Sequence, residues 1–370
     1  MLKEIIHHLH EDPSEPELHV SGHNFEVEDE LALAAEVEAF QEPFSIGIWN
    51  AFPVSDNEAV RLYREMVVIR MFEEAAAHAF TRNRIGGYFH TCIGQEASVV
   101  GIVSALREDD YLIASYREHG HALARGCPPR EVMAELFGRV TGSSRGKGGS
   151  MHLFDAERHF LGGTGIVGGN IPIGTGVALA LKYKDTDSVC ACFFGDGAVN
   201  EGTFHEALNM AGLWQLPVLY VCENNLYGMG THVSRANAVP EMTERASGYG
   251  MERFKVDGMD LFKVRSMTDE LIEHVRHTRR PVFLESLTYR FLGHGSHDPG
   301  KYRSKEEVQH WKERDPIKQT EAVLCRLGVL STSYIEAVHS EAKSVVEDAL
   351  LFAENSPAPE DSELYSDVFA

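Results

Sequence analysis

The amino-acid sequence predicts an α/β fold, a doubly wound and mainly parallel sheet with helices on both faces. The first observation behind this prediction is a strand, helix, strand pattern, in which apolar runs at 188–194 and 217–222 flank a helical segment at 200–213. The second is that glycines recur where apolar runs end, as they do in α/β folds with functional loops. The third is size, because 370 residues with 43% hydrophobic content can bury a large core.

The other elements of this fold are expected in a definite order along the chain. A helix at 56–81 opens the globular domain, since apolar residues recur there at intervals of three and four. Two further helical stretches follow Gly94 and Pro128, and the glycine-rich segment 138–176 is expected to be loop. After the strand, helix, strand unit we expect a strand at 254–256, a helix at 268–278, a strand at 281–289 and a last helix at 334–352.

An acidic N-terminal arm, residues 1–54, precedes a single domain at 55–370 that ends in a helical segment. The arm has twelve acidic residues against one lysine and no arginine. We expect it to be solvated and partly helical, although a metal-binding tail is an alternative because imidazoles are good metal ligands. The histidines concerned are His7, His8, His10, His19 and His23.

The overall charge and the arm also bear on location and partners. A net charge of −22 repels phosphate backbones and anionic lipids, so we expect no nucleic-acid or membrane partner. The acidic arm is the opposite of an Arg-rich mitochondrial presequence and lacks the apolar segment of a signal peptide. We therefore expect a cytoplasmic protein of bacterial type.

The six cysteines form no CxxC pair, so a clustered zinc or redox site is not indicated. Cys190 and Cys192 alternate within an apolar run and would point to one face of a strand. Buried free thiols are the expectation.

The strand ends of the central unit predict a ligand site. The first strand ends in Gly195-Asp196-Gly197 and the second in Asn224-Asn225. Adjacent parallel strands end at the same edge, so Asp196 and Asn225 should meet in the crevice where α/β sheets bind ligands. Their oxygens, with a nearby backbone carbonyl, suit a Mg²⁺ or Ca²⁺ that also takes phosphate oxygens, and the helix starting near residue 200 should direct its amides at that anion. Taken as dipeptides alone, the same residues are common in ordinary turns.

Two other motifs point to different classes of enzyme. Gly163, Gly165 and Gly168 spell GxGxxG with Asp185 beyond, which would suit an NAD-dependent Rossmann dehydrogenase. That motif must follow an apolar strand, whereas the preceding segment 155–159 is polar, so this alternative is weak. A phosphate-binding loop around Gly146-Lys147 fails on spacing and lacks the required Ser or Thr.

The GDG and NN pair resembles the signature of thiamine diphosphate enzymes. From about residue 61 to residue 365 the chain resembles the α subunit of the decarboxylating component of 2-oxo acid dehydrogenases. The blocks that carry the resemblance, in order, are 87–90 (GYFH), 94–96 (GQE), 115–117 (SYR), 146–152 (GKGGSMH), 165–168 (GIVG), and 289–300 with Tyr289, Arg290, His294 and Asp298-Pro299-Gly300.

The resemblance implies two cofactors, thiamine diphosphate and Mg²⁺, and residues that bind them. It places Mg²⁺ on Asp196, Asn225 and the backbone carbonyl of Tyr227. It places the diphosphate near Tyr116 and Arg117, whose planar guanidinium can donate to phosphate oxygens in pairs.

The remaining implied site residues surround the other parts of the ligand. Gly197 and Ala198 would flank the diphosphate, whereas Gly165 and Val167 would present backbone to the aminopyrimidine. His90 and His294 match the histidines near substrate, His294 also near the cofactor, where an imidazole can steady an alkoxide or move a proton.

The activity implied by the resemblance is oxidative decarboxylation of pyruvate and transfer of the acetyl group to a lipoyl domain. Glu223 before the two asparagines resembles the pyruvate and acetoin types, and the branched-chain 2-oxo acid type is a third alternative. In the family a second chain supplies the carboxylic acid that activates the aminopyrimidine, so a β subunit and an α2β2 heterotetramer are implied. The chain departs from regulated relatives at Gly295, where they have a serine directly after the histidine, and Ser296 and His297 follow it here.

Overall fold

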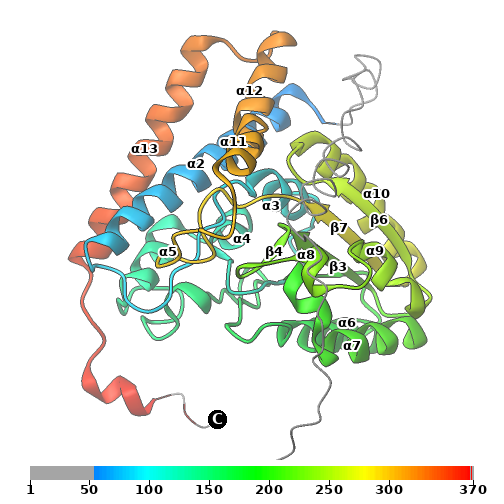
Figure 1. The fold of residues 1–370 in the computed structure, drawn as a ribbon. Coiled ribbons are helices and arrows are strands. Elements are labelled where there is room, and N and C mark those ends of the chain that lie inside the picture. Colours follow the sequence, from blue (N-terminus) through cyan, green and yellow to red (C-terminus); the bar gives the residue numbers. More distant parts are fainter. Residues whose placement is uncertain (1–53, 367, 369–370) are drawn as a thin grey trace, which may run out of the picture. The chain divides into compact units, whose positions relative to one another are not determined.

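The computed structural model describes residues 54–366 and 368. Apart from Val54 the predicted arm lies outside the described residues, and the predictions made for it stay predictions. A parallel sheet of five strands, in the order β1-β2-β3-β7-β6, is the centre of the fold (Figure 1). Its strands are β1 (Tyr111–Ile113), β2 (Cys190–Gly195), β3 (Val218–Asn224), β6 (Glu252–Asp257) and β7 (Val282–Leu287).

Helices cover the sheet on both faces, which confirms the predicted α/β class. On one face α6 (Asn170–Tyr183) and α7 (Gly202–Trp214) pack against each other, and the Tyr220 hydroxyl of β3 hydrogen-bonds Thr175 of α6 at 2.6 Å. Alternate strand residues face the other way, where α10 (Leu261–Thr278) and α3 (Glu96–Val103) pack together. Both central strands, β3 and β7, are buried along their whole length, as parallel strands covered on both sides must be.

The remaining elements extend this core. The N-terminal helix α2 (Asp56–Thr81) packs under the long C-terminal helix α13 (Thr332–Asn355), which also crosses α5 (Pro129–Leu136) (Figure 1). The others are α4 (His119–Ala124), α8 (Val233–Ala236), α9 (Met242–Arg245), α11 (Lys305–Glu313), α12 (Pro316–Arg326), the hairpin β4 (Tyr227–Gly228) and β5 (Thr231–His232), and the 3-10 turns η3 (Gly149–Met151), η4 (Asp196–Asn200), η5 (Ser247–Tyr249) and η6 (Asp361–Tyr365). No helix in the described part of the chain has the length and apolar character that a membrane span requires.

The helix predicted at 56–81 is present with those bounds because its start is capped and its inner face is apolar. The Ser55 hydroxyl accepts a hydrogen bond from the Glu58 amide, which satisfies one of the free N–H groups of the first turn. The strand, helix, strand unit and the later strands are also confirmed, with ends that differ by one or two residues.

Two expectations about local structure are wrong. Residues 170–176 are helix, not loop, and Gly174 packs closely there: a Cβ atom would lie 2.8 Å from the Cys192 Sγ atom. Helix α10 begins at Leu261 rather than near residue 268, because Asp260 caps two amides. Helix α7 begins at Gly202, within two residues of the expected start, and the turn η4 lies between it and the first strand.

The cysteine prediction holds with one exception. Cys190 and Cys192 lie buried on β2, and Cys92, Cys127 and Cys222 are also buried free thiols. Cys325 is exposed, because it lies on the outer side of α12 next to the buried Leu324.

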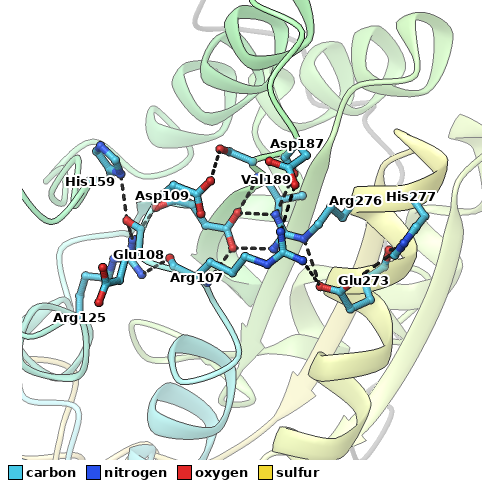
Figure 2. A network of polar contacts seen from close by, with 12 residues as sticks. Arg107, Glu108, Asp109, Arg125, His159, Asp187, Val189, Glu273, Arg276 and His277 are labelled. Carbon is cyan, nitrogen blue, oxygen red and sulfur yellow. Dashed lines mark hydrogen bonds and ion pairs between the residues drawn. The ribbon is translucent and has the colours of Figure 1, made fainter.

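A buried ion pair joins the N-terminal ends of strands β1 and β2 to helix α10 (Figure 2). Asp110, directly before β1, accepts from the Arg276 guanidinium at 3.0 and 2.8 Å and from the Val189 amide, directly before β2, at 2.8 Å. Asp110 is fully buried, so its charge depends on these donors. Arg107 extends the network outward to the exposed Asp187 and to Glu273.

Replacing Asp110 by alanine should lower the free energy of unfolding by about 3–5 kcal/mol, because the buried Arg276 guanidinium loses its buried carboxylate and keeps only the half-exposed Glu273 as an ion-pair partner. Equilibrium urea unfolding measures this loss. The matched control is Asp187→Ala, which removes an exposed partner of Arg107 and should cost less than about 1 kcal/mol. Equal losses in the two variants would contradict a structural role for the buried pair.

Candidate active site

A cavity of about 440 Å³ opens where β2 and β3 end. Every site residue predicted from the sequence lines it: His90, Tyr116, Arg117, Gly165, Val167, Asp196, Gly197, Ala198, Asn225, Tyr227 and His294. These residues come from six separate stretches of the chain, and only the tertiary fold brings them together. The structure therefore confirms their common location, while their individual roles stay predictions.

The register between β2 and β3 places the two polar strand ends side by side. Gly195 pairs with Glu223, so Asp196 follows one strand where Asn225 follows the other, and the Asn225 amide lies 3.4 Å from Asp196 Oδ1. Burial raises the pKa of Asp196 to about 6, although the Asn225 amide opposes this rise. A cation bound next to this buried carboxylate would stabilise its ionised form and lower its pKa again.

The side chain of Asn225 is oriented by two neighbours. Its amide nitrogen donates to Gln95 Oε1 at 3.4 Å, and its oxygen accepts from Arg290 Nε at 3.4 Å. Arg290 is itself almost fully buried and donates to the Met229 carbonyl and the Tyr302 hydroxyl. Arg290 lies in one of the resemblance blocks, yet its part in orienting Asn225 was not predicted because no local pattern reveals it.

Arg117 is a buried cation at the cavity wall. Its guanidinium donates to the backbone carbonyls of Thr91 and His294 at 2.6 and 2.9 Å, and burial lowers its pKa. Within residues 54–366 no carboxylate lies within ion-pair distance of it. A buried guanidinium without a carboxylate beside a cavity favours an anionic ligand there, and a phosphate group suits its planar set of donors.

The two predicted histidines face each other across the cavity. Their ring centroids are 4.9 Å apart, and Tyr116 packs against both rings. Burial, assisted by the Arg117 charge, lowers the pKa of His90 to about 2 and that of His294 to about 4. Both imidazoles are therefore neutral at pH 7, and each offers one N–H donor and one acceptor nitrogen.

Comparison with known proteins decides the family. The family model described as "Dehydrogenase E1 component" matches residues 64–362. The chain belongs to the dehydrogenase E1 component family. It is 48% identical over 315 residues to the pyruvate dehydrogenase E1 component subunit alpha of Rhizobium meliloti (strain 1021), an alignment that covers 85% of this chain and 90% of that one.

More distant relatives of this E1 chain carry the same description. The subunit alpha from Zymomonas mobilis is 45% identical over 313 residues, covering 84% of this chain and 88% of that protein. The chloroplastic subunit alpha-3 from Oryza sativa is 41% identical over 326 residues, covering 86% and 77%.

The glycine-rich loop of this E1 chain is folded around a carboxylate. Glu135 accepts hydrogen bonds from four loop amides, at 2.8 Å from Ser144, 2.8 Å from Gly146, 2.7 Å from Gly148 and 3.0 Å from Gly149. An array of amides that could hold a phosphate is thus filled by the chain's own side chain. This arrangement explains why the loop is no phosphate-binding loop, and no local pattern indicates the part played by Glu135.

A second buried chain of hydrogen bonds fixes the far end of the same loop. His119 Nδ1 lies 2.9 Å from Glu73 Oε2, and its Nε2 lies 2.9 Å from Ser150 Oγ. Although Ser, His and Glu are the residue types of a nucleophilic triad, all three are buried here. They instead position Met151, the next residue, which lines the cavity.

The GxGxxG segment has the wrong context for a nicotinamide site. Gly168 does precede helix α6, but the chain before Gly163 forms only isolated bridges, Asp155 with Phe160 and Leu112 with Phe160. Gly165 and Val167 line the E1 cavity instead. The Rossmann alternative therefore lacks the strand that its motif requires.

The departure at Gly295 has a steric cause. A Cβ atom at Gly295 would lie 2.6 Å from Tyr88 Cε1, a cavity residue that packs against the His90 ring. The displaced hydroxyl of Ser296 donates to the Phe89 carbonyl, and the His297 ring packs edge-on against Phe80. Neither side chain lines the cavity, so the extra imidazole does not join the predicted pair.

Replacing Glu135 by glutamine should loosen the loop at 142–149, because one amide oxygen cannot accept from four amides and the new NH₂ group opposes them. Hydrogen bonds to a charged acceptor contribute about 1.5–3 kcal/mol, so amide exchange in the loop should accelerate about tenfold or more. Hydrogen–deuterium exchange with mass spectrometry measures this. Glu131→Gln, on the same helix, should leave the loop unchanged, and an unchanged loop in Glu135→Gln would contradict the assignment.

Proposed function

We propose that this chain is the α subunit of the decarboxylating E1 component of pyruvate dehydrogenase, with thiamine diphosphate and Mg²⁺ as its cofactors. The observation that carries the proposal is the meeting of Asp196, Asn225 and the buried Arg117 in one cavity. This combination offers oxygen ligands for a cation next to a guanidinium for an anion, which is what a metal-bound diphosphate needs.

The donor set fits the proposed ligand. Asp196 contributes a carboxylate, Asn225 an amide oxygen and Tyr227, at the start of β4, a backbone carbonyl, all of them hard ligands that suit Mg²⁺. Gly197 and Ala198 lie in the turn η4 and line the cavity, where their backbone can approach phosphate oxygens closely. The Cβ atom that Gly228 lacks would lie 3.3 Å from Gly197 Cα, so the two strand ends also pack tightly here.

The histidines are proposed to act on the substrate. Thiamine diphosphate, when bound, supplies the carbanion and the electron sink for decarboxylation of a 2-oxo acid. His90 and His294, as neutral imidazoles, can donate hydrogen bonds to the carbonyl or carboxylate oxygens of that acid. His90 Nδ1 is buried and makes no hydrogen bond to the described protein, so it remains available for the substrate.

We propose pyruvate as the substrate and a lipoyl domain as the acceptor of the acetyl group, with the lipoyl disulfide as oxidant. The support is the description shared by the relatives, together with the resemblance of Glu223, before the two asparagines, to the pyruvate and acetoin types. The alternative substrates are acetoin and branched-chain 2-oxo acids, and an activity assay with each compound would distinguish them from pyruvate.

A β subunit is proposed as the partner, in an α2β2 heterotetramer. Among the described residues that line the cavity, the carboxylic acids are Asp196 and Glu223, and both lie at the strand ends proposed for the metal. We propose that a further acid for the aminopyrimidine comes from the β subunit. Helices α6 and α7 also expose a group of large apolar side chains that suits a protein interface: Ile173, Leu179, Tyr183, Met210, Leu213 and Trp214.

The central test is Asp196→Ala, studied in the chain co-purified with its β subunit. Removal of the carboxylate should abolish Mg²⁺-dependent binding of thiamine diphosphate, measured by calorimetry, and pyruvate-dependent reduction of a dye. Arg117→Lys keeps a charge but loses paired donation, so its affinity for the cofactor should fall by about tenfold or more. Absence of cofactor binding in the wild-type assembly would refute the proposal, whereas binding without pyruvate turnover would redirect it to acetoin or a branched-chain acid.

Cofactor affinity should also depend on pH through Asp196. Because the pKa of this carboxyl is raised to about 6, a proton competes with Mg²⁺ below that pH, and the apparent Kd should rise about tenfold per unit of acidification. Above pH 6 the carboxyl is ionised, so Asp196 should add no further pH dependence to the apparent Kd. Calorimetric titration of Asp196→Asn is the control, since it keeps the titration of the ligand's own phosphate but should lose about one unit of slope. An equal slope in both proteins would contradict the role of Asp196.

A further inference from the structure

A second carboxylic acid lines the cavity, and the proposed function gives it no contact with the ligand. Glu223 lies near the end of β3, is 3% exposed and is one of the residues that line the cavity. His121 of α4 lies beside it, with the His121 Nε2 atom 3.4 Å from Glu223 Oε2. His121 is also buried, and its ring packs edge-on against Phe193.

This pair is incompletely hydrogen-bonded within the protein. Glu223 Oε1 and both ring nitrogens of His121 are buried polar atoms that have no hydrogen-bond partner among residues 54–366. A buried carboxylate oxygen that lacks donors costs free energy, and Glu223 is one of the residues that line the cavity. Its strand neighbour is Gly195, which has no side chain to cover it.

Other buried glutamates show how different Glu223 is. Glu285 accepts from Asn224 and the Thr243 amide, and Glu96 is paired with Arg70. Glu118 also leaves its Oε2 atom without a partner among the described residues, and burial raises the pKa of this carboxyl well above its usual range. Glu118 also does not line the cavity. Glu223 is therefore a buried acceptor that faces a ligand site.

We propose that Glu223, with His121 as its neighbour, is a positioning residue that accepts a hydrogen bond from a donor on the metal-bound diphosphate ligand. This inference rests on the proposed function and adds a residue to it. Glu223 is paired with the residue before Asp196 and lies two residues before Asn225 on the same strand, so its carboxylate borders the proposed metal ligands. Because Mg²⁺ usually keeps several waters, a water on the cation is the donor we favour over a group of the cofactor itself.

His121 is the neighbour that limits how the Glu223 carboxylate can lie. Its Nε2 atom is 3.4 Å from Glu223 Oε2, whereas Glu223 Oε1 has no hydrogen-bond partner among the described residues. The pair thus leaves one carboxylate oxygen as an acceptor beside the proposed metal ligands.

The test uses the chain assembled with its β subunit and two probes, Mn²⁺ with inorganic pyrophosphate and Mn²⁺ with thiamine diphosphate. Calorimetry gives the affinities of wild type, Glu223→Gln, His121→Gln, the double variant and the control Glu118→Gln. Loss of a residue that orients a metal's surroundings typically lowers metal affinity about tenfold or more, so we expect this loss for Glu223→Gln with both probes. His121→Gln should weaken binding in the wild-type background but not in Glu223→Gln, as a double-mutant cycle requires for a coupled pair.

The outcomes separate the possibilities. A loss seen only with thiamine diphosphate supports the acceptor role and places the donor on the cofactor. Wild-type affinity in Glu223→Gln, or an equal loss in Glu118→Gln, would overturn the inference, whereas no binding by the wild type would instead refute the proposed function. If circular dichroism shows that Glu223→Gln is unfolded, His121→Gln decides, and an unchanged affinity in that variant overturns the proposal.

Discussion

The parallel register of β2 and β3 is the constraint on which the site depends. Pairing of Gly195 with Glu223 fixes where both strands end, and therefore which residues leave the sheet at the same place. A shift by one residue would turn every side chain of one strand to the opposite face and separate Asp196 from Asn225. The buried packing of β3 and β7 holds that register, since it leaves no polar face that could tolerate a slip.

Buried charged groups in the scaffold of this protein differ from those at the cavity in how they are paired. Within the scaffold, buried charges have partners from the same chain: Asp110 with Arg276, Glu96 with Arg70, and Glu135 with four loop amides. At the cavity, Arg117 has only carbonyl partners and Asp196 has a raised pKa. These unbalanced groups are costly in the folded chain, and a ligand that carries both a cation and an anion would offset them together.

Local patterns in the sequence predicted the long helices and strands, but not the elements whose form depends on contacts with distant parts of the chain. The helix at 56–81 could be predicted because its periodicity and Ser55 cap are local, and the central strands because their apolar runs are continuous. The short strand β1 was missed, since three residues carry too little pattern. The sequence predicts loop for residues 170–176, the start of helix α6, because the packing of Gly174 against β2 becomes visible only with the neighbouring strand.

For the site, the sequence by itself determined the identity of the residues and their place at strand ends, because motifs such as Gly195-Asp196-Gly197 are short and their chemistry is local. It could not show which polar groups would be satisfied by other parts of the chain. Only the tertiary structure decided that Glu135 fills the glycine-rich loop, that Arg290 orients Asn225, and that His121 lies against Glu223. The physical reason is that each of these interactions joins residues distant in sequence, and hydrogen bonding and burial depend on distances in space.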